Sequence, residues 1–106
     1  MMNERTKRIG AQIRQHIHKL DPKAQVILFG SRARGEERAD SDWDVLVLTD
    51  GPVGLQEERT FRNHLYELEL EIEEPFSLFV YSKEQWVGKQ RITPFYASVE
   101  KEGITL

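Results

Sequence analysis

Cysteine is absent from the 106-residue sequence. Its absence excludes disulfide bridges, zinc–thiolate sites and a cysteine nucleophile. Long apolar runs are also missing, and none approaches the roughly 20 residues that a transmembrane helix needs. The N-terminal segment MMNERTKRIG is polar where a signal peptide needs an apolar region. We therefore predict a cytoplasmic protein that does not associate with a membrane.

The length and composition are those of one folded domain, which we predict to span residues 1–106. Hydrophobic residues make up 39% of the chain and charged residues 31%, a balance typical of a highly charged globular domain rather than a disordered tail. The net charge of −3 conceals a basic segment before Asp21 and an acidic segment between Leu55 and Pro75. Two solvated helix faces of opposite sign explain this pattern most simply, and a partner surface or an RNA contact is the alternative.

Hydrophobic periodicity predicts three strands and five helices. The strands are short apolar runs bounded by turn residues, and they cover residues 24–29, 43–48 and 76–81. The helices are indicated by apolar spacing or by capping residues, and they cover residues 4–20, part of 31–39, 55–73, a segment after Ser82, and 93–101. This order predicts an α/β (α+β) fold with helices packed on a small sheet. The glycine motifs of dinucleotide-binding folds and P-loops are missing.

Asp42 and Asp44 lie two residues apart at the start of the second predicted strand. Side chains alternate along a strand, so both carboxylates point to one face, with their Cα atoms roughly 6.5–7 Å apart. Hard divalent cations such as Mg²⁺ bind carboxylate pairs of this kind, with phosphates completing the ligand shell. A solvated strand entrance is the simpler explanation of the pair alone. However, Asp44 already lies inside an apolar run, where a carboxylate needs a partner.

The segment after the first predicted strand has the composition of a phosphate-binding turn. Gly30 lets the backbone bend sharply and approach a ligand closely, and the Ser31 hydroxyl can donate or accept a hydrogen bond. Arg32 and Arg34 carry forked donors that suit phosphate oxygens. Each residue also has an ordinary alternative role, the glycine in a strand-ending turn and the arginines in surface solubility. Together with the two aspartates, the segment predicts a ligand that carries both phosphate and a cation.

This spacing resembles the signature of the polymerase-β-like nucleotidyltransferases: Gly30-Ser31, ten residues, then Asp42-x-Asp44. The form GSRARG resembles the minimal nucleotidyltransferases (MNT), which are often paired with HEPN-domain proteins as toxin–antitoxin systems. The resemblance is strongest over residues 26–48 and extends more loosely to the tail. It implies a small mixed β-sheet with flanking helices, and a HEPN-domain protein as the partner.

The resemblance also implies the site and its chemistry. Gly30 and Ser31 would hold the triphosphate of an NTP, with ATP as the first choice, and the nearby arginines would bind phosphate. Asp42 and Asp44 would be the catalytic residues and the ligands of Mg²⁺ or Mn²⁺. The implied reaction transfers a nucleoside monophosphate to a protein or RNA acceptor, and pyrophosphate leaves.

One position departs from the family pattern. The family has a third carboxylate on the next strand, and alignment of FSLFVYS assigns that position to Ser77. A hydroxyl is a poor base and a weak metal ligand. Two interpretations remain open: either Glu71 or Glu73 replaces the missing carboxylate, or the chain is a catalytically weak or inactive antitoxin module that binds a nucleotide and a partner. The simpler role of these two glutamates is on a solvated helix face.

Overall fold

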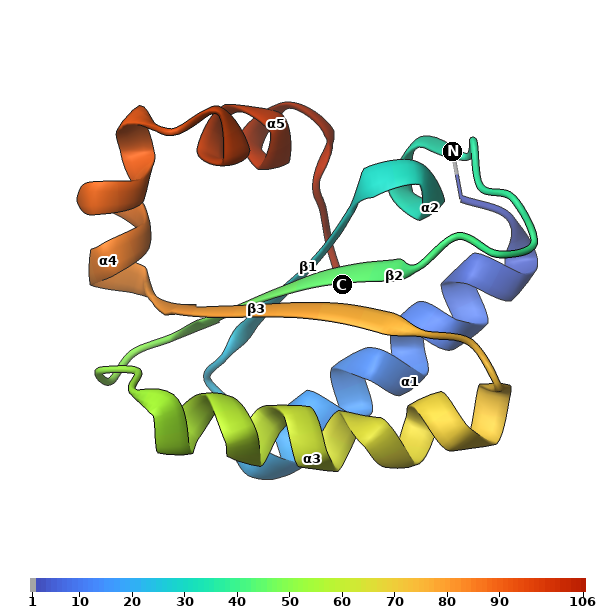
Figure 1. Cartoon of the computed structure of the whole chain (residues 1–106), viewed down its shortest axis with the longest axis horizontal. Coiled ribbons are helices and arrows are strands. Elements are labelled where there is room, and N and C mark those ends of the chain that lie inside the picture. The colour runs from blue at the N-terminus through green and yellow to red at the C-terminus, as the bar shows by residue number, and fades with distance from the viewer. Residues whose placement is uncertain (1) are drawn as a thin grey trace.

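The computed structural model describes residues 2–106, whose strands form a four-stranded sheet in the order β3-β2-β1-β4 (Figure 1). The strands are β1 (Gln25–Phe29), β2 (Trp43–Thr49), β3 (Phe76–Ser82) and β4 (Ile104–Thr105). Strand β1 is antiparallel to both of its neighbours, whereas β2 and β3 are parallel. The sheet is therefore mixed, as the family resemblance implies.

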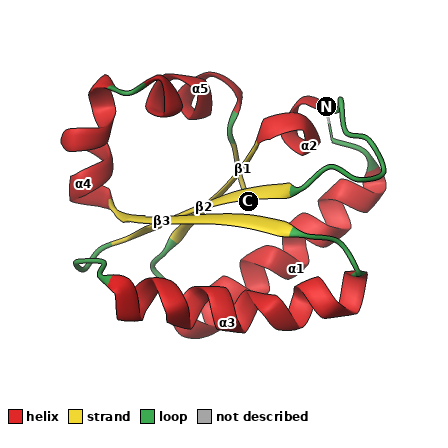
Figure 2. Cartoon of the chain, in the orientation of Figure 1, coloured by secondary structure: helices red, strands yellow, loops and turns green. Residues whose placement is uncertain are grey.

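Helices cover both faces of this sheet, as Figure 2 shows. They are α1 (Glu4–Leu20), α2 (Gly30–Arg34), α3 (Leu55–Ile72), α4 (Lys83–Val87), the 3₁₀ helix η1 (Lys89–Ile92) and α5 (Pro94–Glu102). Helices α1 and α3 lie together on one side of the sheet, and α4 and α5 lie on the other. Helix α2 follows directly on β1, and its Ala33 packs in the cluster formed with α1 and α3. Within residues 2–106, no helix is both long and apolar enough to cross a membrane.

Local capping signals explain where several helices begin. The Asn3 side chain accepts a hydrogen bond of 2.8 Å from the Thr6 backbone at the start of α1. Ser82 caps α4 in the predicted capping box, and Thr93 caps α5 ahead of Pro94. The predicted helices and strands are confirmed with small shifts at their ends. The two shortest elements, η1 and β4, were not predicted, because they have too few residues to show a hydrophobic period.

Alternation along β2 divides its side chains between two hydrophobic clusters. Trp43 and Val45 face α1 and α3 and are fully buried. Leu46 and Leu48 face the opposite side, where they pack with side chains of α4 and α5. Side chains alternate along a strand, so Asp44 points to the same face as Leu46 and Leu48. It is the second residue of β2 and lies beside the start of α2.

Candidate active site

Gly30, the first residue of α2, lies against the carboxylate of Asp44. Gly30 has a φ angle of +74°, a conformation that residues with a side chain rarely adopt. A Cβ atom added there would lie 3.0 Å from Cγ of Asp44 and closer still to its Oδ2. Phe29, the residue before the glycine, is paired with Asp44 across the β1–β2 ladder. Both the backbone conformation and the close approach therefore require glycine at this position.

Asp42, Asp44 and Ser77 lie together where the parallel strands β2 and β3 begin. Ser77 is paired with Asp44 in the ladder, and its hydroxyl donates a hydrogen bond of 2.9 Å to Oδ2 of Asp42. The structure thus places a hydroxyl, and not a carboxylate, beside the aspartate pair on β3. Among residues 2–106, no three His, Cys, Asp or Glu side chains are grouped in a way that could hold a metal ion.

The pKa of Asp44 responds to burial and to three charged side chains near its carboxylate. Partial burial raises the pKa of Asp44, the negative charge of Asp42 raises it further, and Arg34 opposes both effects. Glu102 on α5 also raises this pKa. A divalent cation would relieve such repulsion between carboxylates. Two carboxylates beside a glycine turn fit a cation whose remaining ligands are phosphate oxygens and water.

Arg34 extends from the end of α2 with 41% of its side chain exposed. Its Nη1 donates hydrogen bonds of 3.1 and 3.0 Å to the two carboxylate oxygens of Glu102, and its Nε lies 3.3 Å from Glu36. Hydrogen bonding to Glu102 raises the pKa of Arg34. Ser31, at the start of the same helix, is half-buried. Arg34 is therefore the arginine of the GSRARG motif whose exposed guanidinium is close to the aspartates.

Arg32 has a different environment, since only 4% of its side chain is exposed. Its Nη2 donates hydrogen bonds to the backbone oxygen of Ser41 at 2.8 Å and to Oε1 of Glu74 at 2.9 Å. Its guanidinium lies 4.4 Å from the ring centre of Trp43. Trp43 faces the core formed with α1 and α3, so this guanidinium lies on the side of β2 opposite to Asp44.

The two glutamates considered as replacements for the missing carboxylate lie near the end of α3. Glu71 is exposed on that helix, and Glu73 follows it in a left-handed conformation with φ +57°. Helix α3 packs on the Trp43 face of the sheet, away from the face that carries Asp44. Neither glutamate therefore lies beside Asp42 and Asp44, and neither can replace the missing carboxylate in this arrangement.

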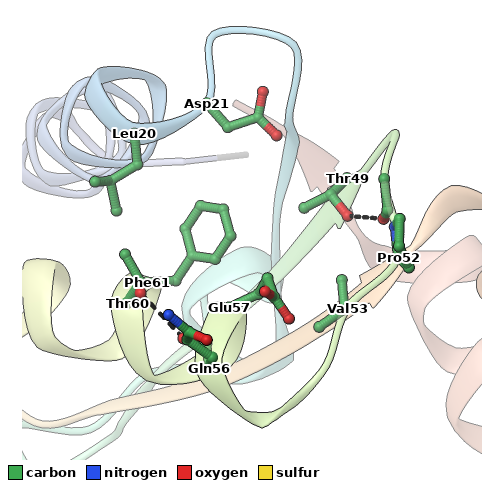
Figure 3. Close-up of a pocket in the computed structure, with 10 residues that line it drawn as sticks. Leu20, Asp21, Thr49, Pro52, Val53, Gln56, Glu57, Thr60 and Phe61 are labelled. Atoms are coloured by element: carbon green, nitrogen blue, oxygen red, sulfur yellow. Dashed lines mark hydrogen bonds between the residues drawn. The ribbon is translucent and has the colours of Figure 1, made fainter.

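A cleft of about 350 Å³ lies between the end of β2 and the start of α3 (Figure 3). Its lining includes Asp21, Thr49 and Glu57, and it contains no basic side chain. Thr49 ends β2, whereas Asp42 precedes the first residue of that strand, so the cleft lies at the opposite end from the aspartates. An acidic lining repels phosphate. This cleft is therefore a poor candidate for a triphosphate site.

Two residues that organise the site, Glu74 and Glu102, were not predicted from the sequence. Glu74 accepts hydrogen bonds from Arg32 and from Nε1 of Trp43, and Glu102 pairs with Arg34. Glu74 is one of many glutamates in the acidic segment, and Glu102 is the last charged residue of a short helix. No local sequence pattern marks either residue, because Glu74 is 42 positions from Arg32 and Glu102 is 68 positions from Arg34.

Comparison with known proteins agrees with this fold. Residues 11–99 match the nucleotidyltransferase domain family, and the chain belongs to that family. Among curated proteins, none has significant sequence similarity to this chain.

Solved structures with the same fold include toxin–antitoxin proteins. One is a crystal structure of a toxin–antitoxin with AMP-PNP, 18% identical, with a TM-score of 0.64 over 91% of this chain and 70% of that one. A mutant of the toxin–antitoxin MntA-HpeT is 16% identical, with a TM-score of 0.63 over the same shares. A crystal structure described as a nucleotidyltransferase is 20% identical, with a TM-score of 0.52 over 91% of this chain and 95% of that one. At these identities the likeness shows the fold.

Proposed function

We propose that the chain transfers the nucleoside monophosphate of an NTP to a protein or RNA acceptor, and that it is the MNT antitoxin of a HEPN-domain toxin. One observation carries the proposal: Gly30 contacts the carboxylate of Asp44. This contact joins a turn suited to phosphate with two carboxylates suited to a divalent cation. A toxin–antitoxin of the same fold was crystallised with AMP-PNP, an analogue of ATP, which supports ATP as the nucleotide.

The proposed roles follow from the position of each side chain. Gly30 and Ser31 hold the triphosphate, and Arg34 pairs with phosphate oxygens after it leaves Glu102. Asp42 and Asp44 hold Mg²⁺ or Mn²⁺, which when bound neutralises phosphate charge and favours ionisation of the acceptor hydroxyl. Burial is the main cause that raises the pKa of Asp44, and the charge of Asp42 is the second, which a cation held between the two carboxylates would offset.

The reaction is an in-line displacement at the α-phosphorus. An acceptor oxygen forms a bond to that phosphorus while the bond to the oxygen that bridges the α- and β-phosphates breaks. Pyrophosphate leaves with the electron pair of the broken bond. The proton of the acceptor hydroxyl passes to solvent, because Ser77 supplies no basic group on β3.

The test is transfer of label from α-labelled NTPs, each supplied separately with Mg²⁺ or Mn²⁺. Acceptors are tRNA and the protein encoded by the adjacent gene. We expect label in one acceptor, and none with the double variant Asp42→Asn and Asp44→Asn. Failure of all four NTPs to label either acceptor would contradict the proposed transferase activity.

The second candidate is an antitoxin that binds nucleotide and partner without catalysis. Ser77 favours it, because the position on β3 beside the aspartates carries no carboxylate. Neutralisation of the partner toxin by the same double variant separates the two candidates. Full neutralisation means that catalysis is not needed, whereas loss of neutralisation with an intact complex supports the enzyme.

A further inference from the structure

The residues around Glu74 join four parts of the chain that are distant in sequence. Oε1 of Glu74 accepts hydrogen bonds from Arg32 at 2.9 Å and from Nε1 of Trp43 at 3.1 Å. Arg5 of α1 also pairs with this carboxylate. The backbone N–H of Trp43 donates to the carbonyl of Pro75 at 3.0 Å. The hydrogen bond of Arg5 is the main cause that lowers the pKa of Glu74, and Trp43 and Arg32 contribute.

Arg32 links this carboxylate to the segment that precedes the aspartates. The same Nη2 atom that donates to Glu74 also donates to the backbone oxygen of Ser41, the residue before Asp42. The guanidinium lies over the ring of Trp43, the residue between the two aspartates. Arg32 therefore contacts the chain on both sides of Asp42 while belonging to the helix that begins at Gly30.

We propose that Arg32 is a positioning residue and not a phosphate ligand: it fixes Asp42 and Asp44 relative to the turn at Gly30. Three observations exclude contact with the triphosphate in this arrangement. Its side chain is 4% exposed, its guanidinium is paired with Glu74, and it lies on the face of β2 opposite to Asp44. The GSRARG motif then has two different arginines, with Arg32 directed to the core and Arg34 directed to the ligand.

Planar geometry explains why arginine is needed here. A guanidinium can stack on an indole ring and donate in its own plane to a carboxylate and a carbonyl at the same time. A lysine ammonium keeps the charge but loses the plane that stacks on the indole ring. Outer residues that orient metal ligands commonly change metal affinity tenfold or more when they are replaced. The inference rests on the proposed function, because it assigns the aspartates to a cation.

The experiment compares Arg32→Lys with the matched control Arg34→Lys on the same helix. Two dissociation constants are measured by calorimetry: that of Mn²⁺ alone, and that of ATP in EDTA. We expect Arg32→Lys to weaken Mn²⁺ binding about tenfold and to leave metal-free ATP binding unchanged. We expect Arg34→Lys to weaken ATP binding about threefold and to leave Mn²⁺ binding unchanged.

The result that overturns the inference is equally specific. If Arg32→Lys weakens metal-free ATP binding as much as Arg34→Lys does, or leaves Mn²⁺ binding intact, Arg32 is not a positioning residue. Should Arg32→Lys fail to fold by circular dichroism, Glu74→Gln replaces it, because glutamine keeps an acceptor for Trp43 but loses the charge paired with Arg32. The same loss of Mn²⁺ affinity is expected, and an unchanged affinity overturns the inference.

Measurements on the unaltered chain separate this inference from the proposed function. If the unaltered chain binds neither Mn²⁺ nor ATP, the proposed function is wrong and the inference is wrong with it. If the unaltered chain binds both and the Arg32 and Glu74 variants bind Mn²⁺ equally well, only the positioning role is overturned.

Discussion

Ser77 donates a hydrogen bond of 2.9 Å to Oδ2 of Asp42, and it is also the residue paired with Asp44 on the parallel neighbouring strand. A single hydroxyl thus touches one aspartate and lies across from the other. A carboxylate at this position would face both aspartates directly. The effect of replacing Ser77 on metal affinity and on stability therefore depends on whether a cation is bound between the aspartates.

Substitution Ser77→Asp is expected to tighten Mn²⁺ binding by about tenfold and to increase label transfer, because it adds a third oxygen ligand beside the pair. Without metal, the same variant should be less stable than the unaltered chain, since three carboxylates then repel one another. Urea unfolding and calorimetry measure the two effects. Ser77→Ala is the control, with a loss of stability of about 0.5 kcal/mol. Unchanged Mn²⁺ affinity in Ser77→Asp would show that the cation does not bind beside β3.

Gly30→Ala is expected to lower stability by about 1–2 kcal/mol, because its φ of +74° is unfavourable for a residue with a Cβ atom. The new Cβ would also displace the Asp44 carboxylate, so Mn²⁺ and ATP binding should be lost together. Gly51→Ala is the matched control, since a Cβ there meets no atom within 4 Å, and its stability should change by less than about 0.5 kcal/mol. Retained binding in Gly30→Ala would argue against the site.

Asp44→Asn is expected to stabilise the metal-free protein at neutral pH by about 2–4 °C in melting temperature. The pKa of Asp44 is raised by burial and by Asp42, so the folded state binds a proton more readily than the unfolded state. The stability of the unaltered protein therefore falls as the pH rises through the interval between the unfolded and folded pKa values. The advantage of the variant should vanish below that interval. Thermal melts in EDTA at several pH values measure it, and a variant that melts lower at neutral pH would contradict the prediction.

Glu74→Ala is expected to lower stability by about 3 kcal/mol at neutral pH, because it leaves the buried guanidinium of Arg32 without its paired charge. The pKa of Glu74 is lowered chiefly by hydrogen bonding to Arg5. Its contribution is thus fully present above the ordinary carboxyl pKa and is lost as the pH falls through the lower folded pKa. Urea titrations should show the unaltered chain and the variant converging in stability as the solution is acidified through that interval. A constant difference across it would mean that charge is not the cause.

The sequence predicted most of the secondary structure, because the apolar residues of each long helix or strand recur at the spacing of that element. Helix α1 begins and ends at the predicted residues, Glu4 and Leu20, since an apolar stripe and the Asp21-Pro22 stop coincide with its limits. Strand β4 was not predicted, because two residues hold no period and their pairing with Ile27 and Leu28 of β1 arises only after the chain has folded.

The sequence by itself determined the positions of the proposed nucleotide site: a glycine turn after one strand and two aspartates at the start of the next. It determined them because backbone freedom and side-chain alternation are local properties. Only the tertiary structure decided that Arg32 turns into the core while Arg34 stays exposed. Their partners, Glu74 and Glu102, come from distant segments that folding brings beside α2. A local sequence pattern cannot predict such long-range pairs.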